Sequence, residues 1–236
     1  MSDTCKERVE EVLAEIQAAA AACGRSVDDI TLMGVSKTHP WDSVIEGYEA
    51  GLRLFGENRV QEVEAKFPRI PERPEGMKLH LIGHLQSNKV KKIVQLVDGI
   101  DSVDSLKLAT LISECALSCG RVMPVLLEFN TSGEEAKSGF ETETALFDML
   151  DHAEGLKGIN IRGLMTIGPL GGDERQVRGA FARLRKLFET CRVRYPSFDF
   201  AVLSMGMSGD FAWAVEEGST VVRVGTRLFG ARDYSK

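Results

Sequence analysis

Short apolar runs that alternate with stretches of helical periodicity constrain the fold of this chain more than any other feature of its sequence. There are eight such runs. Repeated alternation of strand and helix predicts an α/β fold with a parallel sheet, because parallel neighbours need a crossover between them. The predicted strands are Thr31–Ser36, Leu52–Gly56, Leu79–Gly83, Gly99–Val103, Met123–Phe129, Ile161–Ile167, Phe200–Met205 and Thr220–Val224.

The chain length bears on how these strands are arranged. Eight strand–helix units in 236 residues favour a single (β/α)₈ TIM barrel spanning residues 1–236. An open, doubly wound sheet of eight strands is the alternative. A helix over about residues 4–23 precedes the first strand, since Thr4 and Glu7 form a capping box and Gly24 follows. The other predicted helices are Trp41–Ala50, Val60–Phe67, Lys89–Val97, Leu106–Ser118, Thr144–His152, Glu174–Cys191 and Phe211–Glu217.

Composition excludes several classes of function. The net charge of −6 argues against a protein that binds nucleic acid by neutralising phosphates. No apolar run is long enough to span a membrane, and no signal peptide is readable. The five cysteines are odd in number and form no CxxC pair, which indicates a reducing cytoplasm. The four histidines lie in no metal-ligand spacing, and no nucleotide-binding glycine motif occurs, so we expect no metal and no dinucleotide.

Lys37 is the first candidate for chemistry. It ends the run TLMGVSK, on the carboxyl side of the first predicted strand, where barrels of this kind place their active sites. Burial lowers the pKa of an ammonium group, and the neutral amine is the nucleophile that forms an imine with an aldehyde. The alternative is an ordinary solvated lysine at a strand end.

Glycine-containing turns follow the seventh and eighth runs, at Gly206–Gly209 and at Gly225. Barrels often bind phosphate after these two strands. Backbone N–H groups there, together with the Ser208 and Thr226 hydroxyls, are candidate phosphate ligands. Ser208 also precedes a helical stretch and is a candidate N-cap. Two ordinary strand-to-helix turns are the alternative interpretation.

Arg223 lies inside the last apolar run, on the same side of the strand as Val221 and Gly225. If that side faces the barrel interior, its guanidinium points toward whatever binds above. A guanidinium beside a pyridine nitrogen would keep that nitrogen unprotonated, because a guanidinium can only donate hydrogen bonds. The alternative is a salt bridge to a neighbouring strand. His80 and His84 share a side of the third run, where a core histidine is the more common interpretation.

Several longer strings carry a resemblance to a known family. The chain resembles the pyridoxal phosphate homeostasis protein family over about residues 31–234. That resemblance implies a barrel of the alanine-racemase N-terminal type, with pyridoxal 5′-phosphate (PLP) bound to a lysine as a Schiff base. The strings are GVSKTHP, LFGENRVQE, LHLIGHLQSNKVK, IDSVDSLKLA, LLEFNTSGEEAKSGF, IRGLMTIGP, LSMGMSGDFAWAVEEGST and VRVGTRLFGARDY.

The resemblance assigns roles residue by residue. Lys37 matches the Schiff-base lysine, and Arg223 matches the arginine that faces the pyridine nitrogen. Ser208, Gly225 and Thr226 match the phosphate contacts. The residues that match the pocket wall are Asn58, His80, Met165 and Ser204.

The resemblance leaves hypotheses of different classes. The first is a protein that binds, buffers or delivers PLP without significant amino-acid-converting activity. The second is a PLP-dependent racemase that uses Lys37 as its base, and a phosphate-sugar aldolase is a more distant third. Racemases add a β-rich domain that supplies a tyrosine, and none of Tyr48, Tyr195 and Tyr234 lies in such a domain, which favours the first. We further expect a cytoplasmic monomer whose partners are PLP and apo forms of PLP-dependent enzymes.

Overall fold

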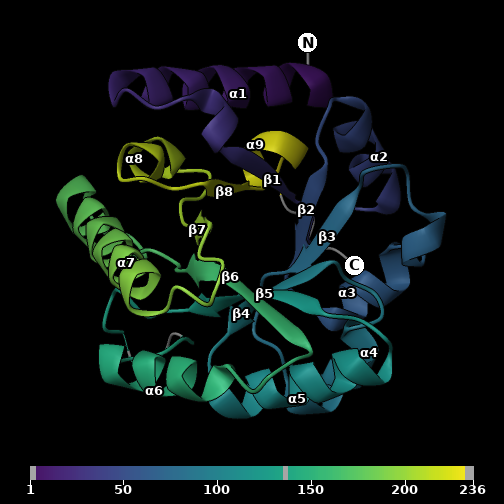
Figure 1. Cartoon of the computed structure of the whole chain (residues 1–236). Coiled ribbons are helices and arrows are strands. Elements are labelled where there is room, and N and C mark those ends of the chain that lie inside the picture. Colours follow the sequence, from purple (N-terminus) through teal and green to yellow (C-terminus); the bar gives the residue numbers. More distant parts are fainter. Residues whose placement is uncertain (1–3, 135–137, 232–236) are drawn as a thin grey trace.

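The eight predicted runs form a closed parallel barrel. The computed structural model describes residues 4–134 and 138–231. Its strands follow one another around the barrel in sequence order, and β1 pairs with both β2 and β8 (Figure 1). The barrel prediction is therefore confirmed, and the open sheet is wrong. The strands are β1 Thr31–Val35, β2 Leu54–Glu57, β3 Lys78–Leu81, β4 Gly99–Val103, β5 Met123–Glu128, β6 Ile159–Met165, β7 Val202–Ser204 and β8 Val221–Val224.

Helices surround this barrel, and α1 lies beside α8 and α9 (Figure 1). The Thr4–Glu7 capping box is present in full: the Glu7 N–H donates to Thr4 Oγ1, and the Thr4 N–H donates to Glu7 Oε2. The helices are α1 Cys5–Ala22, α2 Trp41–Glu49, α3 Val60–Lys66, α4 Val90–Ile93, α5 Leu106–Ser118, α6 Glu143–Ala153, α7 Glu174–Arg194, α8 Phe211–Glu216 and α9 Thr226–Phe229, with single turns of 3₁₀-helix at Val27–Asp29, Ile70–Glu72 and Ser87–Lys89.

The fourth predicted helix is shorter than its sequence pattern. The apolar spacing extends to Val97, and both Val94 and Val97 are buried, but α4 ends at Ile93. The guanidinium of Arg121 donates to the carbonyl oxygens of Val94 and Val97. These carbonyls are therefore satisfied by a tertiary contact rather than by another helical turn.

The inside of the barrel is separate from the larger core beneath the helices. Met33, Val35, Ile82 and Val221 form a small apolar cluster among the strands. Arg223 is on the same side of β8 as Val221, so its side chain also lies in the barrel interior. The geometry therefore places a charged group where most barrels have aliphatic side chains.

Candidate functional site

A cavity of about 230 Å³ lies at the carboxyl ends of β1, β2 and β8. Lys37 is half-buried at this cavity, in the turn that follows β1. The strand ends at Val35, one residue earlier than predicted, so Lys37 lies two residues beyond its end. The lining residues are Val35, Lys37, Asn58, Ile82, Ile167, Met207, Ser208, Gly209, Arg223, Gly225 and Thr226.

The turn that carries Lys37 has an unusual backbone. Thr38 has a φ of +66°, a left-handed conformation that is uncommon for a β-branched residue. Its N–H donates to Glu62 Oε2 at 3.0 Å. The Lys66 ammonium donates to the carbonyls of Ser36 and His39, at 2.7 and 3.0 Å. Side chains of α3 thus hold both ends and the middle of the turn.

Glu57 completes this arrangement from the end of β2. Its Oε1 accepts a hydrogen bond from Ser36 Oγ at 2.6 Å and forms an ion pair with Lys66. Burial raises the pKa of Glu57 to about 7, and Lys66 and Ser36 oppose that rise. Glu57, Glu62 and Lys66, which we call the Lys66 clamp, therefore position the turn that presents Lys37.

Three hydrogen-bonding groups meet in the lining of the cavity. Ser208 Oγ lies 3.3 Å from the Gly225 backbone nitrogen and 3.3 Å from Thr226 Oγ1. The N–H of Gly225 and the hydroxyl of Thr226 both donate to the Ser208 hydroxyl. The structure thus brings together Ser208, Gly225 and Thr226 from two separate turns.

The predicted N-cap role of Ser208 is wrong. The residue before α8 is Asp210, and its carboxylate accepts from the Met207 N–H at 2.5 Å instead of capping the helix. Gly206 permits the turn: its φ is +93°, and a Cβ there would lie 2.5 Å from the Ala214 Cβ. This folding of the turn leaves the Ser208 hydroxyl on the cavity side.

Arg223 is held by neutral acceptors. Its two terminal nitrogens donate to Ser204 Oγ and to the Thr166 carbonyl, each at 2.7 Å. Within the described residues it has no carboxylate at ion-pair distance, so the predicted alternative of a salt bridge to a neighbouring strand is wrong. Burial lowers the pKa of Arg223, while Asp101, Glu128 and Asp210 raise it, and a guanidinium stays charged.

Three residues assigned to the pocket wall are not among those that line the Lys37 cavity. Ser204 accepts the hydrogen bond from Arg223, and Met165 is buried beside it on β6. His80 lies on β3, where its Nδ1 is 2.9 Å from Asp101 Oδ1, and it lines a different cavity. Tyr234, and Lys137 in the string LLEFNTSGEEAKSGF, lie outside the described residues.

The described ranges contain no group of three or more histidine, cysteine, aspartate or glutamate side chains placed to hold a metal ion. All five cysteines are free thiols. In the same ranges, no helix combines the length and the apolar character needed to cross a membrane.

The Lys66 clamp is the part of the site that sequence reasoning missed. Lys66 ends an amphipathic helical pattern, where a lysine is normally solvated. The available signal was Glu57, an acidic residue that directly follows an apolar run, as Lys37 does. A carboxylate in that place needs a buried cation, and the nearest lysine on the following helix is Lys66.

Comparison with known proteins places the chain in a family. It matches the family "Alanine racemase, N-terminal domain" over residues 10–233. Relatives named "Pyridoxal phosphate homeostasis protein" include one from Vibrio alginolyticus, 38% identical over 98% of each chain, and one from Escherichia coli strain K12, 40% identical over 96% of each chain.

Solved structures give the same result. PipY of Synechococcus elongatus, with PLP bound, superposes with a TM-score of 0.80 and 37% identity, over 92% of this chain and all of PipY. An alanine racemase from Streptomyces coelicolor shares the fold alone, with a TM-score of 0.72 and 16% identity over 93% of this chain and 57% of its own. The barrel type inferred from the sequence is confirmed. The chain therefore belongs to the alanine racemase N-terminal domain family and, within it, to the family of the pyridoxal phosphate homeostasis proteins.

Proposed function

We propose that this chain binds pyridoxal 5′-phosphate in the Lys37 cavity and serves the homeostasis of that cofactor. One observation carries the proposal: a lysine, an arginine and a set of hydroxyl and N–H groups line a single cavity of about 230 Å³. The printed names of relatives about 40% identical, and the PLP-bound state of PipY, support it.

The residues present fit the cofactor. PLP supplies an aldehyde that bonds covalently to a lysine amine, and a pyridine ring that withdraws electrons. Lys37 provides the amine at the mouth of the cavity. Ser208, Gly225 and Thr226 hydrogen-bond to one another at 3.3 Å, which is long for a hydrogen bond, so the two hydroxyls can rotate toward phosphate oxygens beside the fixed Gly225 N–H.

Arg223 sets the character of the site. Ser204 and Thr166 orient its guanidinium without neutralising it, and it lines the cavity. A guanidinium donates hydrogen bonds and cannot accept them, so a pyridine nitrogen beside it accepts a bond and stays unprotonated. An unprotonated ring withdraws electrons less strongly. This favours binding and release of the cofactor over amino-acid conversion.

We also propose that residues 1–236 act as one cofactor-binding domain, as a monomer in the cytoplasm, and that apo forms of PLP-dependent enzymes receive the cofactor. The five free thiols support a reducing compartment. Size-exclusion chromatography with light scattering tests the monomer, and an assay of cofactor transfer to an apoenzyme tests the delivery.

Borohydride labelling tests the binding proposal. The wild-type protein mixed with PLP is reduced, digested and mapped by mass spectrometry. We expect the label on Lys37, and we expect Lys37→Ala to lose the visible absorption of the lysine-bound cofactor. Lys89→Ala is the matched control and keeps both signals. A label found mainly on another lysine, such as Lys89 or Lys137, overturns the assignment of Lys37.

A further inference from the structure

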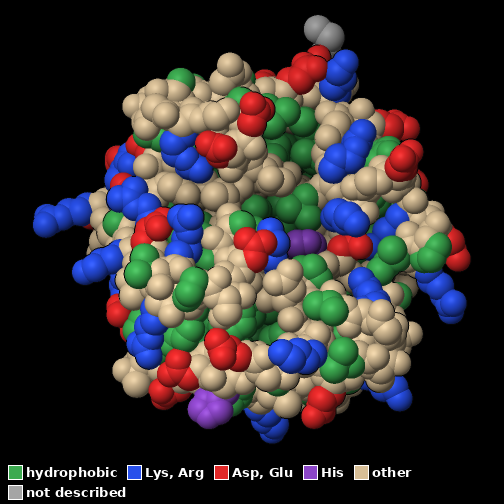
Figure 2. Space-filling view, viewed as in Figure 1, with side chains coloured by type: hydrophobic (Ala, Val, Ile, Leu, Met, Phe, Trp, Pro, Cys, Tyr) green, Lys and Arg blue, Asp and Glu red, His purple; other side chains and the backbone are tan. Residues whose placement is uncertain are grey.

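A second cavity, which we call the lower cavity, lies at the opposite end of the barrel, where the strands begin. It has a volume of about 340 Å³, and its lining includes Thr31, Lys78 and Val221, the first residues of β1, β3 and β8. It shares no lining residue with the Lys37 cavity. Figure 2 shows a hollow near the centre of the view, where apolar side chains and a histidine are visible between acidic and basic ones.

The walls of this lower cavity are largely apolar. Met33, Leu54, Leu126, Val202 and Val221 contribute aliphatic surface from five different strands or strand ends. A volume of this size lies at the lower end of the range for small-molecule sites, and it admits a ring-sized apolar body. The space thus fits an apolar group rather than a sugar or a nucleotide.

A histidine–aspartate pair forms the polar part of the wall. His80 Nδ1 lies 2.9 Å from Asp101 Oδ1, and both residues line the cavity. Within the described residues, Nε2 of His80 has no hydrogen-bond partner. Gly99 makes room for the ring, since a Cβ there would lie 2.7 Å from Cε1 and Nε2. The side chain of His80 is 22% exposed while that of Asp101 is buried, so the unused ring nitrogen is open to a molecule that enters the cavity.

Protonated His80 offers an N–H donor to a ligand, while its charge is balanced by that of Asp101. Burial lowers the pKa of His80, but the charge and hydrogen bond of Asp101 outweigh burial, so the net shift is upward. An aspartate that accepts from Nδ1 leaves Nε2 to donate to a ligand when the ring is protonated. The group that such a donor binds best is a carboxylate.

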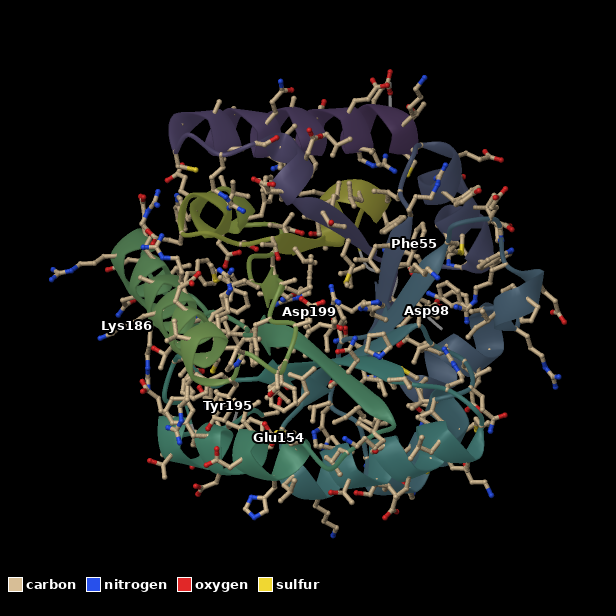
Figure 3. All side chains as sticks on the ribbon, viewed as in Figure 1. Phe55, Asp98, Glu154, Lys186, Tyr195 and Asp199 are labelled. Atoms are coloured by element: carbon tan, nitrogen blue, oxygen red, sulfur yellow. The ribbon has the colours of Figure 1, made fainter. Side chains whose placement is uncertain are left out.

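Cationic side chains surround the mouth of the cavity. Arg53, Lys78 and Arg162 all contribute to its lining. Asp98 faces Lys78 at 3.9 Å but is already paired with the buried Arg73 at 3.0 Å. Asp199 pairs with Arg162. Asp98 and Asp199, which precede β4 and β7, are labelled in Figure 3. The guanidinium of Arg53 donates to the Tyr48 and Leu52 carbonyls and lies 4.2 Å from the centre of the Tyr48 ring. It has no carboxylate at ion-pair distance in the described ranges, so its positive charge at the rim is not balanced by an ion pair.

We propose that the lower cavity is a second ligand site, and that it takes a small monocarboxylate with an apolar, ring-sized body. The carboxylate binds His80 and the cationic rim, and the apolar body fills the space between Met33 and Val202. This site lies beyond the proposed cofactor function, and its occupant differs from PLP in charge and in polarity.

Fluorine NMR of para-fluorobenzoate tests the proposal on the PLP-loaded protein. We expect the benzoate to bind, and the neutral isostere para-fluorobenzamide to bind at least about tenfold more weakly, as for the loss of one charge-assisted hydrogen bond. His80→Gln lowers the benzoate affinity by a similar factor. Arg162→Gln, at the rim, lowers it about threefold. Val202→Phe fills the cavity and abolishes binding.

Arg192→Gln, on the outer face of α7, is the matched control and leaves binding unchanged. Circular dichroism checks each variant, and if His80→Gln fails to fold, Val202→Phe and Arg162→Gln decide. The proposal is overturned by equal binding of benzoate and benzamide, by undiminished binding in Val202→Phe, by displacement of benzoate on adding more PLP, or by no binding at about 10 mM.

Discussion

Replacing Lys66 with methionine tests whether the Lys66 clamp holds a buried charge. The side chain of Lys66 is 9% exposed and that of Glu57 is fully buried. The substitution removes two hydrogen bonds to backbone carbonyls, which cost about 2 kcal/mol together, and it also removes the cation beside the Glu57 carboxyl. Breaking a buried ion pair from one side costs about 3–5 kcal/mol.

The cost depends on pH because Glu57 titrates. Its pKa in the folded protein is about 7, above the ordinary value of 4.5, so the bound proton stabilises the folded state at low pH and this stabilisation is lost as the pH rises through 7. Without Lys66 the folded-state pKa of Glu57 rises further. The stability penalty of Lys66→Met is therefore constant below about pH 6 and grows above pH 7, by up to about 1.4 kcal/mol for each pH unit.

Urea unfolding followed by tryptophan fluorescence measures this penalty. Trp41 packs edge-on against Phe67, the residue after Lys66, and reports on this region. We expect the free energy of unfolding to fall by about 2 kcal/mol at pH 6 and by about 4 kcal/mol at pH 8.5.

Two controls isolate the charge of Glu57. Lys6→Met removes an exposed partner of Glu10 and changes stability by less than about 1 kcal/mol at either pH. In the double variant E57Q/K66M the penalty loses its pH dependence. A penalty for Lys66→Met that is the same at both pH values would refute the reasoning, because Glu57 would then carry no charge for Lys66 to balance.

Further predictions concern cofactor contacts and the core. Thr226→Ala weakens PLP binding by about 1–3 kcal/mol in absorbance titrations and leaves binding of pyridoxal, which lacks the phosphate, nearly unchanged; equal losses for both ligands contradict a phosphate role. Phe55 is fully buried on β2 (Figure 3), and Phe55→Ala lowers the free energy of unfolding by about 3–5 kcal/mol. Leu170→Ala, at an exposed position, changes it by no more than about 0.5 kcal/mol, and a larger effect would mean that Leu170 is packed in solution.

The strands of this barrel were predictable because most of their residues are buried. Such strands form continuous apolar runs, and all eight runs overlap the observed strands. Closure of the sheet into a barrel was predictable from eight strand–helix units in a chain of 236 residues. The end of α4 and the short helix α9 were not predictable, because the first depends on Arg121, which is distant in sequence, and the second has only four residues.

The candidate site was predictable where a charged residue interrupts an apolar run. Arg223 stands out for this reason, and Lys37 does so at the end of its run. Ser208 and Thr226 were found because glycine-containing turns follow the last two strands. The Lys66 clamp and the His80–Asp101 pair depend on contacts between residues that are 9 to 30 positions apart along the chain, and no local pattern reports such contacts.

Amino-acid turnover separates a cofactor carrier from an enzyme, and we expect it to be absent. Racemisation removes a proton from one face of a carbon and returns one to the other, which requires two acid–base groups on opposite sides of the substrate. Lys37 supplies one such group. Among the described residues that line its cavity there is no histidine, tyrosine, cysteine or carboxylate to supply the second. Arg223 adds a second obstacle, since its guanidinium favours an unprotonated pyridine ring.

Chiral chromatography of alanine, serine, lysine and ornithine incubated with the PLP-loaded protein measures turnover, with an alanine racemase as the positive control. A turnover of about 1 s⁻¹ or more that disappears in Lys37→Ala would show that this barrel is an enzyme, and that its second acid–base group lies outside the residues lining the Lys37 cavity.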